Sequence, residues 1–395
     1  MSKQEFRGLE RRETQVDPRR EMSERLPESI QPLLTALTGK AGPDDVEIRA
    51  WTPSERLVAT IAELAVGVAG GAAAVAIGGP ALVALPVTTL MAAAAARTLQ
   101  TSFVHHASHG RLVPSSKRWN RFWGEVASVL AWLQPLEDYE PEHKIHHNQL
   151  ATEADPDLVF VRDVLGFKGG APRAESWRRL RRLIVSPKFH LSRTLARAKA
   201  NLIDASPKRR AASWAYLALL LGGTASTGAW LPMLVGYVLP VIVLQNVGAV
   251  LQTLSEHAWV HLGYGRDSKS AIHRRLTFTR YSGESLPVRG SGPLAWIRWW
   301  AAMLLVHGPL KHWITGLDLG EHLLHHIEPN GFDWARFAFS RREHEAKLAK
   351  GEERVVWGLF AALDLTFAHL ELLPEGAELG DPEGYGWIDP RLLDM

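Results

Sequence analysis

The sequence contains no cysteine among its 395 residues. Disulfides, thiolate zinc sites and iron–sulfur clusters are therefore excluded, because all three need cysteine sulfur. Any bound metal must be held by His, Asp or Glu, and any electrons must arrive from another protein. The net charge of +3 is small, and no basic stripe alternates with aromatic residues, so no nucleic-acid partner is expected.

A secretory signal is also missing from the start of the sequence. Residues 1–50 are charged and contain no early apolar core. We expect them to form a cytosolic, partly flexible N-terminal segment.

Long apolar runs do occur, and they alternate with Arg-rich polar stretches. Apolar runs of sufficient length predict helices that cross a bilayer. Four spans are predicted, at about residues 57–79, 81–103, 213–228 and 231–254. The predicted fold is therefore all-α: an integral membrane protein with four transmembrane helices and a cytosolic helical cap that carries histidines. Residues 51–330 form the predicted membrane domain, and residues 331–395 form a cytosolic C-terminal cap.

The orientation of these spans follows from the distribution of Lys and Arg. The short turns within the two pairs of spans contain neither residue, whereas the loops 111–211 and 262–292 contain clusters of both. The positive-inside rule places both long loops and both termini in the cytosol. The Ala-, Arg- and Gly-rich composition indicates a bacterial plasma (inner) membrane.

Ten of the seventeen histidines fall into four tight groups. The groups are His105 and His109; His143, His146 and His147; His257 and His261; and His322, His325 and His326. Histidines three or four apart share one face of a helix, so each group can direct its imidazoles to one point. Ten imidazoles are too many for one tetrahedral zinc, but they match two six-coordinate irons with open positions for O2. The predicted orientation places all four groups on the cytosolic side.

The remaining histidines are assigned other roles. On a helix His106 points about 100° away from His105, so we do not expect it to be a ligand. We expect His190, His273, His344 and His369 to be solvated, and His307 and His312 to be structural or to support the ligands. Glu142, Glu256 and Glu321 each precede a histidine group and can accept hydrogen bonds from metal-bound imidazoles. Helix capping or solvation explains these three carboxylates almost as well.

The paired His-x2-His-His boxes resemble those of the membrane fatty acid desaturase and hydroxylase superfamily. Thr152 and Asp155-Pro156-Asp157 follow the second group as they do in many desaturases, and Ile327-Glu328-Pro329 follows the last. His257 and His261 resemble an extra ligand element of some members. The resemblance covers about residues 57–330. The sequence departs from the pattern at His106, where an acidic residue is common, and in the long interval between His261 and His322.

The resemblance implies a di-iron site held by the ten grouped histidines, with Asp155 and Asp157 as further supporting carboxylates. It also implies O2 as oxidant, a fatty acyl or related lipid substrate, and an external electron donor of the ferredoxin or cytochrome b5 type. Desaturation is the expected reaction. Hydroxylation and oxidative decarboxylation remain alternatives, because they use the same ligands. A membrane metal transporter is a more distant alternative, since its ligands belong at mid-membrane, where the predicted spans contain only Glu63 and Arg97 as charged residues.

Overall fold

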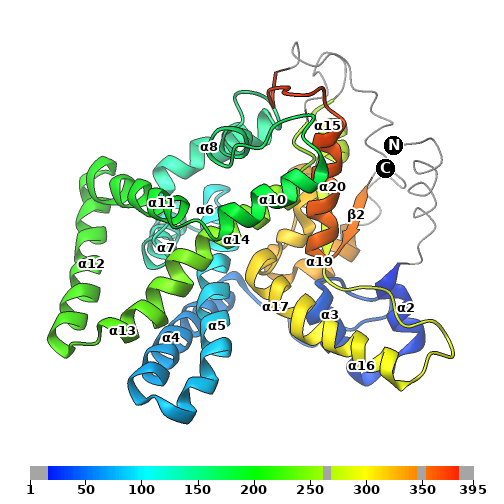
Figure 1. The fold of residues 1–395 in the computed structure, drawn as a ribbon, viewed down its shortest axis with the longest axis horizontal. Helices are drawn as coiled ribbons and strands as arrows, with labels where there is room; N and C mark the ends of the chain where they lie inside the picture. Colours follow the sequence, from blue (N-terminus) through cyan, green and yellow to red (C-terminus); the bar gives the residue numbers. More distant parts are fainter. Residues whose placement is uncertain (1–16, 261–267, 345–352, 382–395) are drawn as a thin grey trace.

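The computed structural model describes residues 17–260, 268–344 and 353–381. Within these ranges the chain is mostly helical, as predicted (Figure 1). The predicted all-α fold needs one addition, a two-stranded parallel sheet in which β1 (Phe278–Tyr281) pairs with β2 (Arg354–Trp357). Both strands are rich in the β-branched and aromatic residues that favour extended backbone.

Two short helices, α2 (Pro18–Arg25) and α3 (Gln31–Thr38), form the start of the described chain. Arg19 is almost fully buried between them and forms an ion pair with Asp45. Met22 and Leu34 pack in one core cluster with Trp299 and Met303 from the later part of the chain. The segment 17–50 is therefore tied to the rest of the protein.

Three helical stretches are long and apolar enough to cross a membrane. The first is α4 (Pro53–Ile77), which starts with a capping box between Thr52 and Glu55. The second runs from Gly79 to Ser108 and combines η3 (Gly79–Ala84), α5 (Leu85–Thr98), η4 (Leu99–Val104) and α6 (His105–Ser108). The third combines α13 (Trp230–Met233), η7 (Leu234–Leu244) and α14 (Gln245–Glu256). These stretches match three of the four predicted spans.

Small residues allow the first two stretches to approach each other closely. A Cβ atom on Gly67 of α4 would lie 2.5 Å from the backbone nitrogen of Ala92 in α5, which is too close for any side chain. Gly236 of η7 lies equally close to α4, because a Cβ there would lie 2.7 Å from the nitrogen of Ala72. Close backbone contact of this kind is typical of helices that pack in a bilayer.

The remaining predicted span lies within α12 (Pro207–Thr227). This helix is not among the three stretches that are long and apolar enough to cross a membrane, and Lys208, Arg209 and Arg210 occupy its first turn. Leu219 and Leu221 are nevertheless exposed on its surface. The fourth span therefore stays a prediction. In Figure 1 the turn between α4 and α5 and the turn between α12 and α13 both lie at the lower edge of the view.

The polar connections form the other helices. Between the second and third stretches lie α7 (Lys117–Leu130), α8 (Leu136–Asn148), α9 (Pro156–Val159), η5 (Phe160–Val164), α10 (Arg173–Ile184), α11 (Pro187–Lys199) and η6 (Ala200–Asp204). After the third stretch lie α15 (Lys269–Leu276), α16 (Pro293–Ala302), η8 (Met303–His307), α17 (Gly308–Leu310), η9 (Lys311–Thr315), η10 (Leu319–Glu321), α18 (His322–Ile327), η11 (Trp334–Arg336), α19 (Phe337–His344) and α20 (Leu359–Glu371). The main core joins α14 to α20 through Leu254, Leu363 and Phe367. This packing fixes the end of α14, from which the third histidine group starts.

Candidate metal centre

Nine of the ten grouped histidines lie together and form two sets of imidazoles. The first set is His105, His109, His143, His147 and His325, and the second is His146, His257, His322 and His326. Within each set, one ring nitrogen from every residue lies within 4.8 Å of the others. His261 lies outside the described residues, so its position relative to the second set stays a prediction.

Each His-x2-His-His box serves both sets. In α8, His143 and His147 belong to the first set and His146 to the second. The arrangement is reversed in α18, where His322 and His326 belong to the second set and His325 to the first. Helix geometry explains this division, because residues four apart differ by about 40° around the helix, whereas adjacent residues differ by about 100°. The expectation that one box points to one place is therefore corrected: each helix bridges the two sets.

The nitrogens of the rings converge closely. In the first set, His105 Nε2 lies 2.8 Å from His325 Nε2, and His109 Nε2 lies 2.9 Å from His143 Nε2. In the second set, His322 Nε2 lies 3.1 Å from Nε2 of both His257 and His326. Neutral imidazoles that turn their lone pairs toward a common point repel one another unless a cation lies between them. The residues present therefore fit two imidazole-bound metal ions.

Several Nδ1 atoms have partners that leave Nε2 free to bind metal. His146 Nδ1 lies 2.9 Å from Oδ1 of the fully buried Asp155 and donates to it. His105 Nδ1 donates to the carbonyl of Thr101 at 2.9 Å, and His257 Nδ1 lies 3.1 Å from the Thr277 hydroxyl. Partners of this kind fix the tautomer and the orientation of a metal-binding imidazole.

Of the five predicted supporting carboxylates, only Asp155 and Asp157 lie against an imidazole in the described chain. Asp157 is 3.5 Å from His146 Nδ1, farther than Asp155, and its side chain is half exposed. Glu142 is exposed and accepts a hydrogen bond from Gln134. Glu256 forms an ion pair with Arg280. Glu321 forms one with Arg341 and accepts a hydrogen bond from the Tyr281 hydroxyl.

A buried carboxylate near the first set was missed by the sequence reasoning. Asp318 accepts hydrogen bonds from the Ser102 hydroxyl at 2.7 Å and from His106 Nε2 at 2.6 Å. The His106 ring stacks on Trp334 and is not part of either set, as expected from its angle on the helix. Asp318 lies four residues before the last histidine group, and only a search for acids at that spacing could have found it.

Two histidines that were expected to be solvated are buried. His273 stacks on His326 and its Nε2 atom donates to the carbonyl of His147 at 3.0 Å. His369 is fully buried in α20. These two expectations are wrong, because tertiary packing places α15 and α20 against the metal centre and the core. His190 and His344 are partly buried, and each bonds a backbone carbonyl. Of the two remaining histidines, His312 pairs with Glu63 and His307 lies 3.7 Å from Glu284.

Burial controls the protonation of the two sets. It lowers the pKa of His109 to about 3, and it lowers the pKa values of His143, His147 and His325 well below the usual range, with mutual repulsion adding to the effect. These rings are therefore neutral and offer lone pairs at neutral pH. Burial would also lower the pKa of His146, but the carboxylates of Asp155 and Asp157 outweigh it and raise that pKa to about 9. In the second set one ring must therefore give up a proton when it binds metal.

The comparisons with known proteins agree with this geometry. A family model described as "Fatty acid desaturase" matches residues 79–359, which is more than half of the chain and includes all ten grouped histidines. No curated protein matches the sequence.

Proposed function

Because the chain belongs to the fatty acid desaturase family, whose members are membrane-associated oxidoreductases of lipids, we propose that it is an O2-dependent di-iron enzyme. Its substrate would be a fatty acyl group or a related lipid, and its reaction would oxidise an unactivated C–H bond. The observation that carries the proposal is the convergence of nine imidazoles into one set of five and one of four. The proposed ligands are these nine together with His261.

The chemistry of the donors favours iron. A set of five imidazoles exceeds the four ligands of a structural zinc site. Neither set fills all six coordination positions of a six-coordinate metal. Imidazole is a good ligand for iron, and open positions are what a metal that reacts with O2 requires. Bound iron would activate O2, the oxidant, for C–H cleavage, which no protein side chain can do.

The chain's own residues orient the imidazole rings and hold the helices that carry them in place. Asp155 and the Thr101 carbonyl hold the His146 and His105 rings in the tautomer that presents Nε2. The bonds of Asp318 to His106 and Ser102 link η4 and α6 to the segment before α18. Rigid positioning matters because the carbon that is oxidised is selected by where the substrate is held.

Electrons would come from a separate protein, since the chain contains no cysteine for an iron–sulfur cluster. We propose a donor of the ferredoxin or cytochrome b5 type. Arg178, Arg181 and Arg182 are exposed on α10 and offer a basic surface for an acidic donor.

For the membrane arrangement we propose four spans, with both termini and the metal centre on the cytosolic side of a bacterial inner membrane. Three apolar stretches and the exposed Leu219 and Leu221 of α12 support this arrangement. The two short turns at one edge of Figure 1 support it as well.

The test is the metal content of the detergent-purified protein, measured by mass spectrometry. We expect about two irons per chain, as two separate imidazole sets predict. His146→Ala and His325→Ala remove one ligand from different sets and should each lose iron and turnover. His190→Ala is the matched control, because His190 bonds only the Ile184 carbonyl in the described chain and lies in neither set. Stoichiometric zinc, or full iron content in both ligand variants, would refute the proposal.

The reaction we propose is desaturation. Product mass identifies it, since desaturation removes two hydrogens from the substrate. Hydroxylation would add one oxygen and oxidative decarboxylation would remove CO2.

A further inference from the structure

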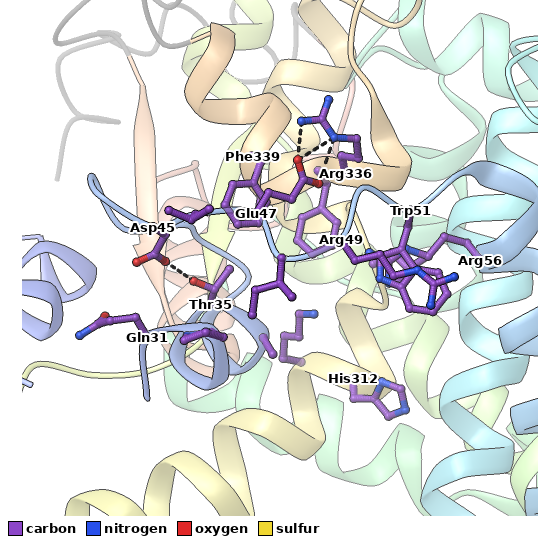
Figure 2. A pocket seen from close by; sticks show the side chains of 18 of the residues that line it. Gln31, Thr35, Asp45, Glu47, Arg49, Trp51, Arg56, His312, Arg336 and Phe339 are labelled. Carbon is purple, nitrogen blue, oxygen red and sulfur yellow. Dashed lines mark hydrogen bonds and ion pairs between the residues drawn. The ribbon is translucent and has the colours of Figure 1, made fainter. Parts of the chain in front are cut away.

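A cleft of about 810 Å³ opens between the N-terminal segment and the start of α4 (Figure 2). Its walls come from α3, the segment 44–51, the first turns of α4, the start of η9, and residues 336–339. None of the nine imidazoles of the two sets lines it. The cleft is therefore a site separate from the metal centre.

Most carboxylates in the cleft already have a partner. Arg336 Nε donates to both oxygens of Glu47 at 2.9 Å, as Figure 2 shows near the top of the view. Asp45 forms its ion pair with Arg19, and Glu63 pairs with His312. The two other acidic residues of the lining, Glu28 and Asp44, are exposed to solvent. Arginines therefore neutralise Asp45 and Glu47, and Glu63 is held by an imidazole.

Two cations in the lining have no carboxylate in ion-pair contact among the described residues, although Asp318 attracts both from farther away. The Lys311 ammonium has no hydrogen bond or ion pair among the described residues, and it lies 5.1 Å from the centre of the Phe337 ring. Arg56 donates through Nε to the Ala335 carbonyl and lies over Trp51, and within the described ranges no carboxylate forms an ion pair with it. Burial, with repulsion from Arg56 as the second cause, outweighs the attraction of Asp318 and lowers the pKa of Lys311 to about 8. An anion in the cleft would relieve this repulsion.

An apolar groove continues from the cleft along α4. A second hollow of about 400 Å³ shares Arg49, Trp51 and Ala59 with the cleft and extends past Val58 and Ala62. Val58 and Ala62 are exposed on a helix that is apolar enough to cross a membrane. The hollow therefore runs from a cationic end to a surface that faces lipid.

We propose that the cleft binds the anionic head of a membrane amphiphile, with Arg56 and Lys311 contacting the head and the chain lying along Val58 and Ala62. A phosphodiester and a carboxylate share the required chemistry, because both accept charge-assisted hydrogen bonds from these two cations. The size of the cleft accommodates either head. This site is a second ligand site and depends on neither bound iron nor turnover.

The test is lipid binding to the full-length, iron-loaded protein in neutral detergent, measured by native mass spectrometry. The probes are phosphatidylglycerol, oleate, inorganic phosphate and, as the neutral reference, phosphatidylcholine. We expect phosphatidylglycerol or oleate to bind at least about tenfold more tightly than phosphatidylcholine, because each cation can contribute a charge-assisted hydrogen bond. Preference for phosphatidylglycerol identifies a phospholipid head, and preference for oleate identifies a free fatty acid. Equal binding of inorganic phosphate would overturn the requirement for an amphiphile.

In the variant Arg56→Gln/Lys311→Gln, the affinity for the anionic lipid relative to phosphatidylcholine should fall at least about tenfold. The control Lys188→Gln/Arg289→Gln removes the same two charges from exposed positions outside the cleft and should keep it. Ala62→Leu fills the groove on an exposed helix face, so it tests the chain position without disturbing the core, and Ala65→Leu is its control. An equal loss in variant and control, or no preference in the unmodified protein, would overturn the proposal. Iron content is expected to be unchanged in all four variants, so failure here is distinct from failure of the oxidase proposal.

Discussion

Asp155→Asn is the change that tests the metal centre most directly without removing a ligand. Oδ1 of Asp155 accepts hydrogen bonds from His146 Nδ1 and from the Asp157 backbone nitrogen, both at 2.9 Å. Oδ2 accepts one from the Ala151 nitrogen at 2.8 Å, and Ala151 has a left-handed φ of 59°. An asparagine has only one oxygen, so its amide group must face either the imidazole or the Ala151 nitrogen. One orientation leaves the Ala151 nitrogen without its acceptor, and the other leaves both His146 Nδ1 and the Asp157 nitrogen without theirs.

The size of the effect follows from these contacts. Removing the outer partner of a metal-bound histidine costs about 10–100-fold in metal affinity, or about 1.4–2.8 kcal/mol. The loss should be confined to the second set, because Asp155 touches His146 and none of the five rings of the first. Asp155→Asn should therefore bind the first iron normally and the second about 10–100-fold more weakly.

The assay is iron content measured against a series of iron buffers, which separates the two affinities. Asp157→Asn serves as a graded control, since Asp157 lies 3.5 Å from His146 Nδ1 and is half exposed, and its loss should be smaller. Glu142→Gln should have no effect, because Glu142 is exposed and bonds Gln134. Unchanged affinity in Asp155→Asn, or an equal loss in Glu142→Gln, would refute the assignment of Asp155 as the partner of a metal-bound ring.

Three further predictions concern proton release, packing and orientation. The pKa of His146 is raised to about 9, whereas that of His109 in the first set is lowered to about 3, so metal binding to the second set at pH 7 should release about one proton. The metal affinity of the second set should rise up to tenfold per pH unit until pH 9. Calorimetry in two buffers of different ionisation enthalpy measures the proton release, and Asp155→Asn should reduce it. Gly67→Ala should lower the midpoint of thermal unfolding by an amount that corresponds to about 1–3 kcal/mol, because the added Cβ would overlap α5. Gly222→Ala is the control and should be neutral or stabilising, because a Cβ there meets nothing within 4 Å. Equal midpoints in the two variants would contradict the close contact of α4 with α5. Because the chain contains no cysteine, a single cysteine can be introduced as a labelling site. In sealed inside-out vesicles a membrane-impermeant thiol reagent should modify Lys188→Cys and spare Gly79→Cys. The reverse labelling pattern would invert the proposed orientation.

The sequence was most informative where a pattern stays within one helix. Apolar runs predict helices by composition alone, and three of the four predicted spans correspond to stretches long and apolar enough to cross a membrane. The fourth run is shorter and follows Lys208, Arg209 and Arg210, so composition alone leaves it undecided. Histidine spacing likewise predicted that imidazoles gather, and the residues four apart in each box do belong to one set, whereas those three apart do not.

Contacts between distant segments could not be predicted in the same way. Periodicity orients His146 and His147 relative to each other, but it does not say which ring of α18 each one meets. Asp318 reaches His106 across 212 residues of sequence, and His273 bonds the His147 carbonyl across 126. The acids adjacent to the histidine groups illustrate the same limit: Glu256 and Glu321 pair with Arg280 and Arg341 instead of with imidazoles.

The division of each box between the two sets has a mechanical consequence. Because α8 and α18 each contribute to both sets, neither helix can move without displacing ligands of both. His325 Nε2 lies 3.1 Å from His147 Nε2, so the two helices touch through the very atoms that would bind metal. A metal in the first set would therefore hold α8 and α18 together through His147 and His325, and this same contact would position His146, His322 and His326. Two independent sites built from separate helices would lack this coupling, whereas shared helices make the geometry of the first set a condition for the geometry of the second.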